Sequence, residues 1–212
     1  MDGKSAPRAT ALIVPGGPDA WERAGFACDE AGFGAGDVEV RFDPAVDRGL
    51  IWLEGPAQDR HPGADGAGAA ARPGPVAREL PVRHPNGVTG VDHIVVATPD
   101  PERTRAALED EGLECRRVRR TTVAGREIEQ GFHPAGSCLI EVVGPDGRSG
   151  EERAAVWGVT FVTPELDRLA ARRPQAVASI RDAVQPGRRI ATALTEAGLP
   201  IPVAFMDPRT SS

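Results

Sequence analysis

The sequence is poor in lysine, cysteine, aromatic residues and long apolar runs. Lys4 is the single lysine among 25 basic residues, which a GC-rich coding sequence explains without any function. Three cysteines, Cys28, Cys115 and Cys138, are an odd number and widely spaced, and this pattern indicates neither a disulfide framework nor a zinc knuckle. No apolar run approaches the roughly 18 residues of a membrane span, and residues 1–4 lack the layout of a signal peptide. We therefore expect a cytoplasmic protein.

Other absences narrow the function further. A formal net charge of −6 and a pI near 5.3 argue against nucleic acid and anionic membranes as partners. The sequence contains no Gly-Lys-Ser/Thr, no G-x-G-x-x-G and no G-x-S-x-G, so neither a phosphate-binding loop nor a nucleophile elbow is predicted.

Glycine and proline are abundant, with 25 and 20 residues, and they divide the chain. Residues 56–87 contain no aromatic residue and few large apolar ones, so they cannot bury enough surface to offset the cost of ordering, and we expect a linker there. This places a first unit at 1–55, a main domain at 88–207 and a loose tail at 208–212.

The main domain shows the same order of elements twice. In its first half we predict a strand, a helix opened by Asp100-Pro101-Glu102, and three further strands. In its second half a helix opened by Pro164 follows the first strand, and three strand-like stretches follow the helix. The expected strands are 91–97, 113–118, 126–133, 138–143, 158–163, 178–184, 188–194 and 201–206.

The N-terminal unit repeats this order in miniature. We predict strands at 11–14, 26–28, 38–42 and 50–54, with a short helix at 18–24 that also opens on a proline, Pro18. Three weak repeats of one unit explain the pattern more economically than one unrepeated fold. The predicted class is therefore α+β, with two βαβββ modules in the main domain and a degenerate third module at the N-terminus.

This pattern resembles the vicinal oxygen chelate superfamily, the glyoxalase and bleomycin-resistance group, and within it the glyoxalase-like proteins of GC-rich bacteria. The residues that carry the resemblance are GVDHIVVATPDPERTRAALEDEGLECRR (90–117), GFHPAGSCLIEVVGP (131–145) and WGVTFVTPELDRLAAR (157–172). In this superfamily two modules enclose a cleft that holds a divalent metal or a small ligand. The resemblance also allows a homodimer.

The resemblance implies that His93, on the first strand, and Glu141, on the last strand of the same module, are metal ligands and catalytic residues. The residues themselves agree, because Glu141 interrupts the apolar run Leu139–Val143 and a buried carboxylate is expensive unless it is paired or ligates a metal. Strand alternation places His93 with Val91 and Val95, and Glu141 with Leu139 and Val143.

The partner module departs from the family pattern. Its equivalent positions fall on Gly158 and about Ala204, neither of which can ligate a metal. A third ligand would have to come from His133, Glu129 or His84. Three interpretations of His93 and Glu141 stay open: one divalent metal (Fe, Mn, Ni or Zn), a metal-free cleft that both side chains line, or two polar groups that satisfy each other in the core.

Four further residues are candidates for ligand contact. Alternation puts Gln130 on the face opposite Glu129, where its amide would reach a ligand carbonyl, and Phe132 would line an apolar pocket. Gln185 and Arg188 flank a Pro-Gly turn and would place an amide and a guanidinium at the cleft mouth. Their alternatives are an exposed edge amide, a core aromatic ring and a solvated β-turn. Cys138 lies among apolar residues and is expected to be an inert thiol.

Two classes of function follow. The first is a lyase or isomerase of the glyoxalase type that stabilises an enolate while Glu141 moves a proton. Extradiol ring cleavage is less favoured, since it needs two histidines and one carboxylate. The second is a non-catalytic protein of the bleomycin-resistance type that holds a drug or metabolite, and the missing ligands of the partner module favour this class.

Overall fold

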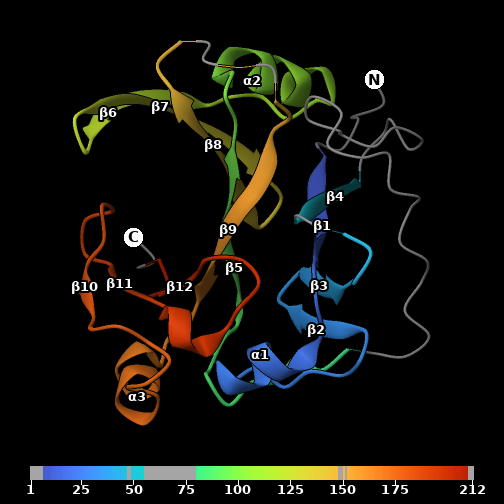
Figure 1. Cartoon of the computed structure of the whole chain (residues 1–212), viewed down its shortest axis with the longest axis vertical. Coiled ribbons are helices and arrows are strands. Elements are labelled where there is room, and N and C mark those ends of the chain that lie inside the picture. The colour runs from blue at the N-terminus through green and yellow to red at the C-terminus, as the bar shows by residue number, and fades with distance from the viewer. Residues whose placement is uncertain (1–6, 47–48, 55–79, 148–149, 151, 210–212) are drawn as a thin grey trace.

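The computed structural model describes residues 7–46, 49–54, 80–147, 150 and 152–209. Most of the expected linker lies outside these residues, as do the two ends of the chain. Within them the chain forms a four-stranded and an eight-stranded sheet with three α-helices (Figure 1). No helix in the described part of the chain is long and apolar enough to cross a membrane.

Two βαβββ modules build the eight-stranded sheet, which confirms the predicted α+β class. Its strand order is β10-β11-β12-β9-β5-β8-β7-β6. The first module comprises β5 (Gly90–Ala97), α2 (Pro101–Asp110), β6 (Arg117–Val123), β7 (Arg126–Ala135) and β8 (Cys138–Pro145). The second comprises β9 (Ala155–Val162), α3 (Leu166–Arg172), β10 (Arg181–Asp182), β11 (Arg189–Thr192), a 3-10 turn η2 (Thr195–Ala197) and β12 (Val203–Met206).

The modules meet where β5 pairs antiparallel with β9. Each first strand pairs parallel with the last strand of its own module, so that Val95 lies opposite Glu141 and Thr160 opposite Ala204. The sheet curls at both ends toward one side, and its edge strands β6 and β10 flank the resulting opening (Figure 1). The concave face of the sheet therefore lies between its two edge strands.

Local sequence explains the first module well. Pro101 begins α2, and the Asp100 carboxylate accepts a hydrogen bond from the backbone N–H of Arg103 at 3.0 Å, as its capping position predicts. Buried residues alternate with half-buried ones along β8, which separates a core face from a cleft face. The prediction for α3 was less accurate, since this helix begins at Leu166, two residues after Pro164.

The N-terminal unit has the predicted order of elements but a different pairing. Its elements are β1 (Arg8–Val14), α1 (Pro18–Arg23), β2 (Gly32–Ala35), β3 (Val38–Phe42) and β4 (Leu50–Glu54), and the sheet order is β2-β3-β1-β4. The strand predicted at 26–28 is wrong, and β2 was missed. β4 pairs antiparallel with β1, as β9 of the second module pairs antiparallel with β5 of the first. The N-terminal unit therefore contains three strands of one module, and β4 takes the position that the first strand of a following module would have.

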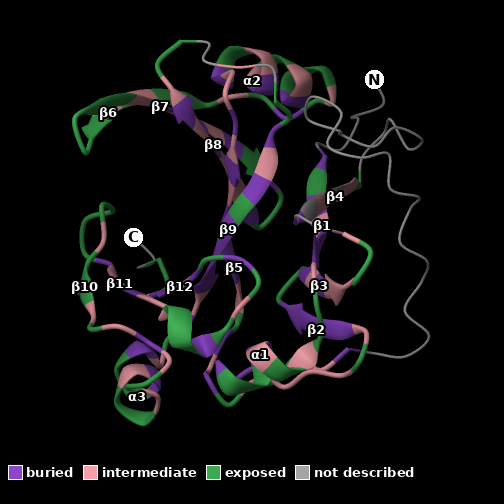
Figure 2. Ribbon diagram, in the orientation of Figure 1, coloured by how far each residue is buried: buried purple, intermediate pink, exposed green. Residues whose placement is uncertain are grey.

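An aromatic cluster joins the two sheets on the side away from the cleft. Trp21 on α1 is fully buried, and its ring lies 5.3 Å from Phe26, 5.2 Å from Phe33 and 6.2 Å from Phe161 of β9. Phe26 is not in a strand because its ring fills this core. Figure 2 shows the buried residues concentrated on the central strands, whereas β6 and β10 are exposed.

The described end of the expected linker, residues 80–87, packs against the first sheet. Leu80 is buried, the Pro81 carbonyl accepts from the N–H of Gly34 at 2.8 Å, and buried Asn86 donates to the Ala24 carbonyl at 3.2 Å. These residues form hydrogen bonds with a folded neighbour, so the predicted linker boundary at 87 was too late.

Candidate active site

The cleft face of the eight-stranded sheet brings together polar side chains from four strands. His93 lies on β5, Thr160 on β9, Glu141 on β8 and Gln130 on β7. A β-bulge at Asp92 shifts the alternation of β5, since Val91 pairs with Phe161 while His93 pairs with the next residue, Thr160. The prediction that Val91 shares a face with His93 is therefore wrong, and Val91 is in the core.

His93 is held by hydrogen bonds at both ring nitrogens. Its Nδ1 lies 2.8 Å from a carboxylate oxygen of Asp92, and its Nε2 lies 3.0 Å from the Thr160 hydroxyl. A carboxylate accepts only, so the neutral ring carries its proton on Nδ1 and donates it to Asp92. The Nε2 lone pair then accepts the hydroxyl proton of Thr160 on the cleft face of the sheet.

Asp92 forms a buried ion pair with Arg188. Arg188 donates through Nη2 to Asp92 at 2.7 Å and through Nε to the Asp207 carbonyl at 2.8 Å. The side chains of Arg188 and Asp92 are only 6% and 5% exposed. Burial opposes ionisation of Asp92, but the hydrogen bonds and charges of His93 and Arg188 hold its pKa lowered at about 2. Asp92 is therefore a fixed anion that orients the imidazole.

Glu141 completes the cluster on the other side of His93. One carboxylate oxygen accepts from Gln130 Nε2 at 2.6 Å, and the other lies 3.8 Å from His93 Nε2. The side chains of His93 and Glu141 are 12% and 14% exposed, so both are accessible from the cleft but mostly screened from water. Gln130 Oε1 is buried and has no hydrogen-bond partner among the described residues. A ligand with a donor group would satisfy it.

The structure places the other predicted ligand contacts differently. Phe132 lies directly opposite Glu141 in the β7–β8 register, on the cleft face. Gln185 is exposed in the turn between β10 and β11. Arg188 is not at the cleft mouth as predicted but buried against Asp92, because that carboxylate needs a counter-charge in the interior.

The three predicted sources of a third metal ligand all lie elsewhere. His133 is buried on the opposite face of β7, where its Nδ1 donates to the Leu113 carbonyl at 2.8 Å and burial lowers its pKa. Glu129 is buried there too and pairs with Arg105 and Arg120. His84 lies 2.7 Å from the Gly34 carbonyl, against the first sheet.

The donor set does not fit a divalent metal well. Catalytic metal sites usually take three or more protein ligands, and the described residues contain no group of three His, Cys, Asp or Glu that could hold an ion. His93 and Glu141 supply two, and both already accept hydrogen bonds, from Thr160 and Gln130. In the second module Ala204 lies opposite Thr160, as Glu141 lies opposite Val95 in the first. Ala204 is therefore the equivalent of Glu141, and it has no ligating side chain.

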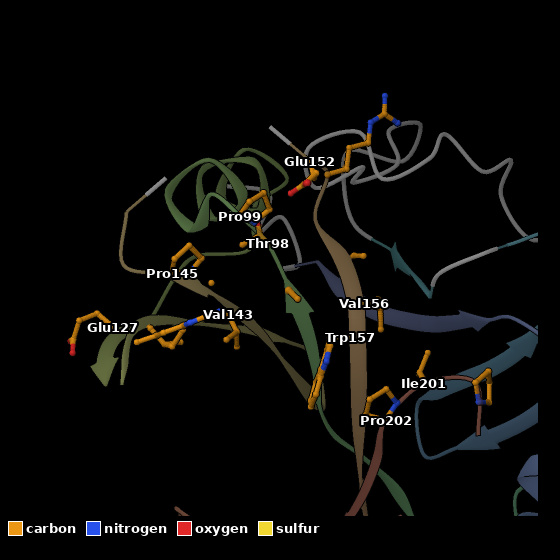
Figure 3. Close-up of a pocket in the computed structure, with 17 residues that line it drawn as sticks. Thr98, Pro99, Glu127, Val143, Pro145, Glu152, Val156, Trp157, Ile201 and Pro202 are labelled. Carbon is orange, nitrogen blue, oxygen red and sulfur yellow. The ribbon is translucent and has the colours of Figure 1, made fainter. Parts of the chain in front are cut away.

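An open cavity of about 830 Å³ lies farther along the same strands, and none of the residues of the cluster lines it. Its lining includes Val143, which lies opposite Gln130 in the β7–β8 register, and Ala97, which shares the cleft face of β5 with His93. Figure 3 shows Trp157 between Val143 on one side and Pro202 on the other. Trp157 is 57% exposed, an unusual position for a large ring unless it contacts a partner.

Two residues of the cluster escaped the sequence analysis. Asp92 precedes His93 inside an apolar strand, and an adjacent acid and histidine at a strand centre is the signal that was available. Thr160 gave no signal, because a threonine in a strand is ordinary. Cys138 is buried as predicted, and burial raises its pKa to about 12.

The sequence matches no protein-family model and no curated protein. Among solved structures, the chain is similar to methylmalonyl-CoA epimerase from Mycobacterium tuberculosis, with 17% identity over 58% of this chain and 91% of that chain and a TM-score of 0.45. A variant of Streptomyces coelicolor methylmalonyl-CoA epimerase in complex with 2-nitronate-propionyl-CoA has 18% identity over 58% and 99% of the two chains and a TM-score of 0.45. A hypothetical protein from Bacillus halodurans C-125 has 11% identity over 57% and 96% and a TM-score of 0.44. Similarities of this strength assign no activity to this chain.

Proposed function

We propose that this chain is a glyoxalase-like protein of the vicinal oxygen chelate superfamily that acts as an isomerase or lyase on a small molecule. The observation that carries the proposal is the pairing of His93 and Glu141 on the cleft face, with 3.8 Å between Nε2 and the carboxylate. Such a pair can remove a proton from a carbon acid and return it, and positioned groups of this kind typically contribute about 10²–10⁴-fold in rate.

In this mechanism each residue of the cluster has a separate task. The Glu141 carboxylate takes a proton from a hydroxyl-bearing carbon next to a substrate carbonyl, which gives an enolate, and later returns this proton to the former carbonyl carbon. His93 Nε2 takes the proton of the neighbouring hydroxyl and passes it to the enolate oxygen, so that the hydroxyl and the carbonyl exchange places. Asp92 and Arg188 keep the imidazole in the tautomer whose Nε2 is free to accept. The amide of Gln130 donates to Glu141 in the free protein and is placed to donate to the enolate oxygen instead.

The proposal needs no metal ion. The positions that would supply further ligands are Gly158 and Ala204, which have no ligating side chain, so His93 and Glu141 would be two ligands where catalytic sites usually have three or more. Proton transfer by the pair alone is the chemistry that this donor set supports.

A second candidate is a binding protein of the bleomycin-resistance type that does not turn its ligand over. The observation that favours it is the cavity beside the cluster, with its exposed Trp157. One tryptophan ring and four prolines around an open cavity suit a planar apolar ligand, and such binding requires no catalytic residue.

Proton exchange in D₂O separates the two candidates. Proton NMR would follow the α-hydrogen of 2-oxo carboxylates, 2-hydroxy aldehydes and acyl thioesters with the wild type, Glu141→Gln and His93→Gln. Glu114→Gln is the matched control, because Glu114 is 72% exposed. We expect exchange in at least one compound, reduced about 100-fold or more in both cleft variants and unchanged in the control and in EDTA.

The opposite results are equally informative. If no compound exchanges faster with the wild type than with Glu141→Gln, the catalytic proposal is wrong and the binding candidate replaces it. If EDTA abolishes exchange and a divalent ion restores it, the metal-free mechanism is wrong. Thermal unfolding of each variant shows whether the substitution has changed the fold rather than the chemistry.

A further inference from the structure

Two arginines of the edge strand β6 share the cleft face with the catalytic pair. Arg117 lies directly opposite Phe132 in the β6–β7 register, and Arg119 lies directly opposite Gln130. Residues directly opposite in an antiparallel pair project from the same face of the sheet. Because Gln130 contacts Glu141 in the cleft, both arginines are positioned on the cleft side of β6.

Neighbouring arginines of this region have partners, but these two do not. Arg116 pairs with Glu114, and Arg120, which faces the other side of β6, pairs with Glu129 and Asp146. Within the described part of the chain, no hydrogen bond or ion pair engages the guanidinium of Arg117 or Arg119. Two like charges on one strand face repel each other, which an anion between them would relieve.

The distance from these arginines to the reacting groups suits a small ligand. Arg117, Phe132 and Glu141 occupy one row across β6, β7 and β8. Neighbouring strands are about 4.8 Å apart, so the backbones of Arg117 and Glu141 are about 10 Å apart along this row. Both side chains stand on the same face of the curled sheet, so a ligand that contacts the guanidinium and the carboxylate together has to span about this distance.

We infer that the substrate is a small organic anion whose carboxylate or phosphoryl group binds Arg117 and Arg119. The inference rests on the proposed function, since it places the reactive carbon over Glu141 and His93. The remaining, apolar part of the substrate enters the cavity beside Trp157. Guanidinium groups recognise planar and tetrahedral oxyanions by charge-assisted hydrogen bonds, often in pairs, so the shared chemistry is an oxyanion.

Fluorescence titration with phenylacetate, phenylphosphonate and the neutral phenylacetamide tests this inference. Trp157 is the exposed reporter in the cavity, and because the chain has three tryptophans, the difference between the wild type and Trp157→Phe gives the contribution of Trp157 to the signal. We expect saturable binding of at least one of the two anions to the wild type, with phenylacetamide at least about tenfold weaker. The comparison of the two anions distinguishes a carboxylate site from a phosphoryl site.

Two variants and one control assign the binding to the two arginines. Arg117→Gln and Arg119→Gln should each weaken binding of the anion about tenfold or more. Arg116→Gln removes the same charge from the same segment, at a side chain that is 67% exposed and paired with Glu114, and should leave the dissociation constant within about twofold. Circular dichroism checks that all three variants are folded.

Three results would overturn the inference. They are equal binding of phenylacetamide and the anions, unchanged affinity in both arginine variants, and no saturable binding of either anion. Glu141→Gln should still bind the anion, because the binding assay requires no turnover. Anion binding without proton exchange would therefore refute the proposed function alone, and exchange that is insensitive to both arginine substitutions would refute the anion site alone.

Discussion

Replacing Arg188 with methionine removes both hydrogen bonds that this side chain makes, to Asp92 and to the Asp207 carbonyl. Methionine fills similar space without a charge, so the substitution leaves the carboxylate of Asp92 in the interior with two remaining partners, His93 at 2.8 Å and the largely exposed Arg209 at 3.8 Å. Breaking a buried pair in this way costs about 3–5 kcal/mol, because an uncompensated charge stays buried. We expect Arg188→Met to lose this much free energy of unfolding.

The adjacent Arg189 provides a matched control. Its side chain is 42% exposed and pairs with Asp167 and Asp207 near the surface, where ion pairs contribute about 0–1 kcal/mol. Urea unfolding at neutral pH should therefore show a small change in Arg189→Met and a large one in Arg188→Met. The double variant Asp92→Asn/Arg188→Met should recover part of the loss, since it removes the buried charge as well. Equal effects of the two arginine substitutions would refute the reasoning.

Three further predictions concern other parts of the molecule. The pKa of Asp92 is lowered from 3.8 to about 2, so its ionisation contributes about 2 kcal/mol to the free energy of unfolding. This contribution should be present above pH 4 and be lost as the pH falls through 2. Urea unfolding across this range should show the free energies of unfolding of the wild type and Asp92→Asn converging at the acid end. Trp21→Ala should cost about 3–5 kcal/mol, because its fully buried ring joins the two sheets, and a change below 1 kcal/mol would contradict that role. A Cβ at Gly158 would lie 2.7 Å from the Pro202 carbonyl oxygen, so Gly158→Ala should lower stability by about 1–3 kcal/mol, whereas Gly90→Ala, with nothing within 4 Å, should not.

The main domain could be predicted because its elements carry strong local signals. The apolar strand that became β8, the capping Asp100 with Pro101, and the recurrence of one element order were all visible in the sequence. The N-terminal unit was harder, since β2 is a short run of small residues and glycines, GFGA, without the alternation of a strand. The stretch at 26–28 looked like a strand because Phe26 and its neighbours are apolar, but tertiary packing around Trp21 decided its structure.

The site was predicted in part for a similar reason. His93 and Glu141 stand out because polar residues in apolar strands are costly. Arg188 looked like a surface residue beside a Pro-Gly turn, and its buried partner Asp92 is 96 residues away in the sequence. Contacts of that kind depend on the register of strands from different modules, which no local pattern encodes.

The seam between β5 and β9 contains two irregularities, one on each strand. The extra residue on β5 is Asp92, and the extra residue on β9 is Trp157. These two extra residues occupy equivalent places in the two modules. Val95 pairs with Glu141 of the last strand in the first module, and Thr160 pairs with Ala204 of the last strand in the second. Asp92 lies three residues before Val95, and Trp157 lies three residues before Thr160. Equivalent irregularities thus carry two different side chains: Asp92, whose carboxylate accepts from the imidazole of His93, and Trp157, whose exposed ring lines the cavity. Deleting either residue would move the side chains at one end of its strand to the opposite face of the sheet. The two extra residues therefore determine which side chains of β5 and β9 face the cleft.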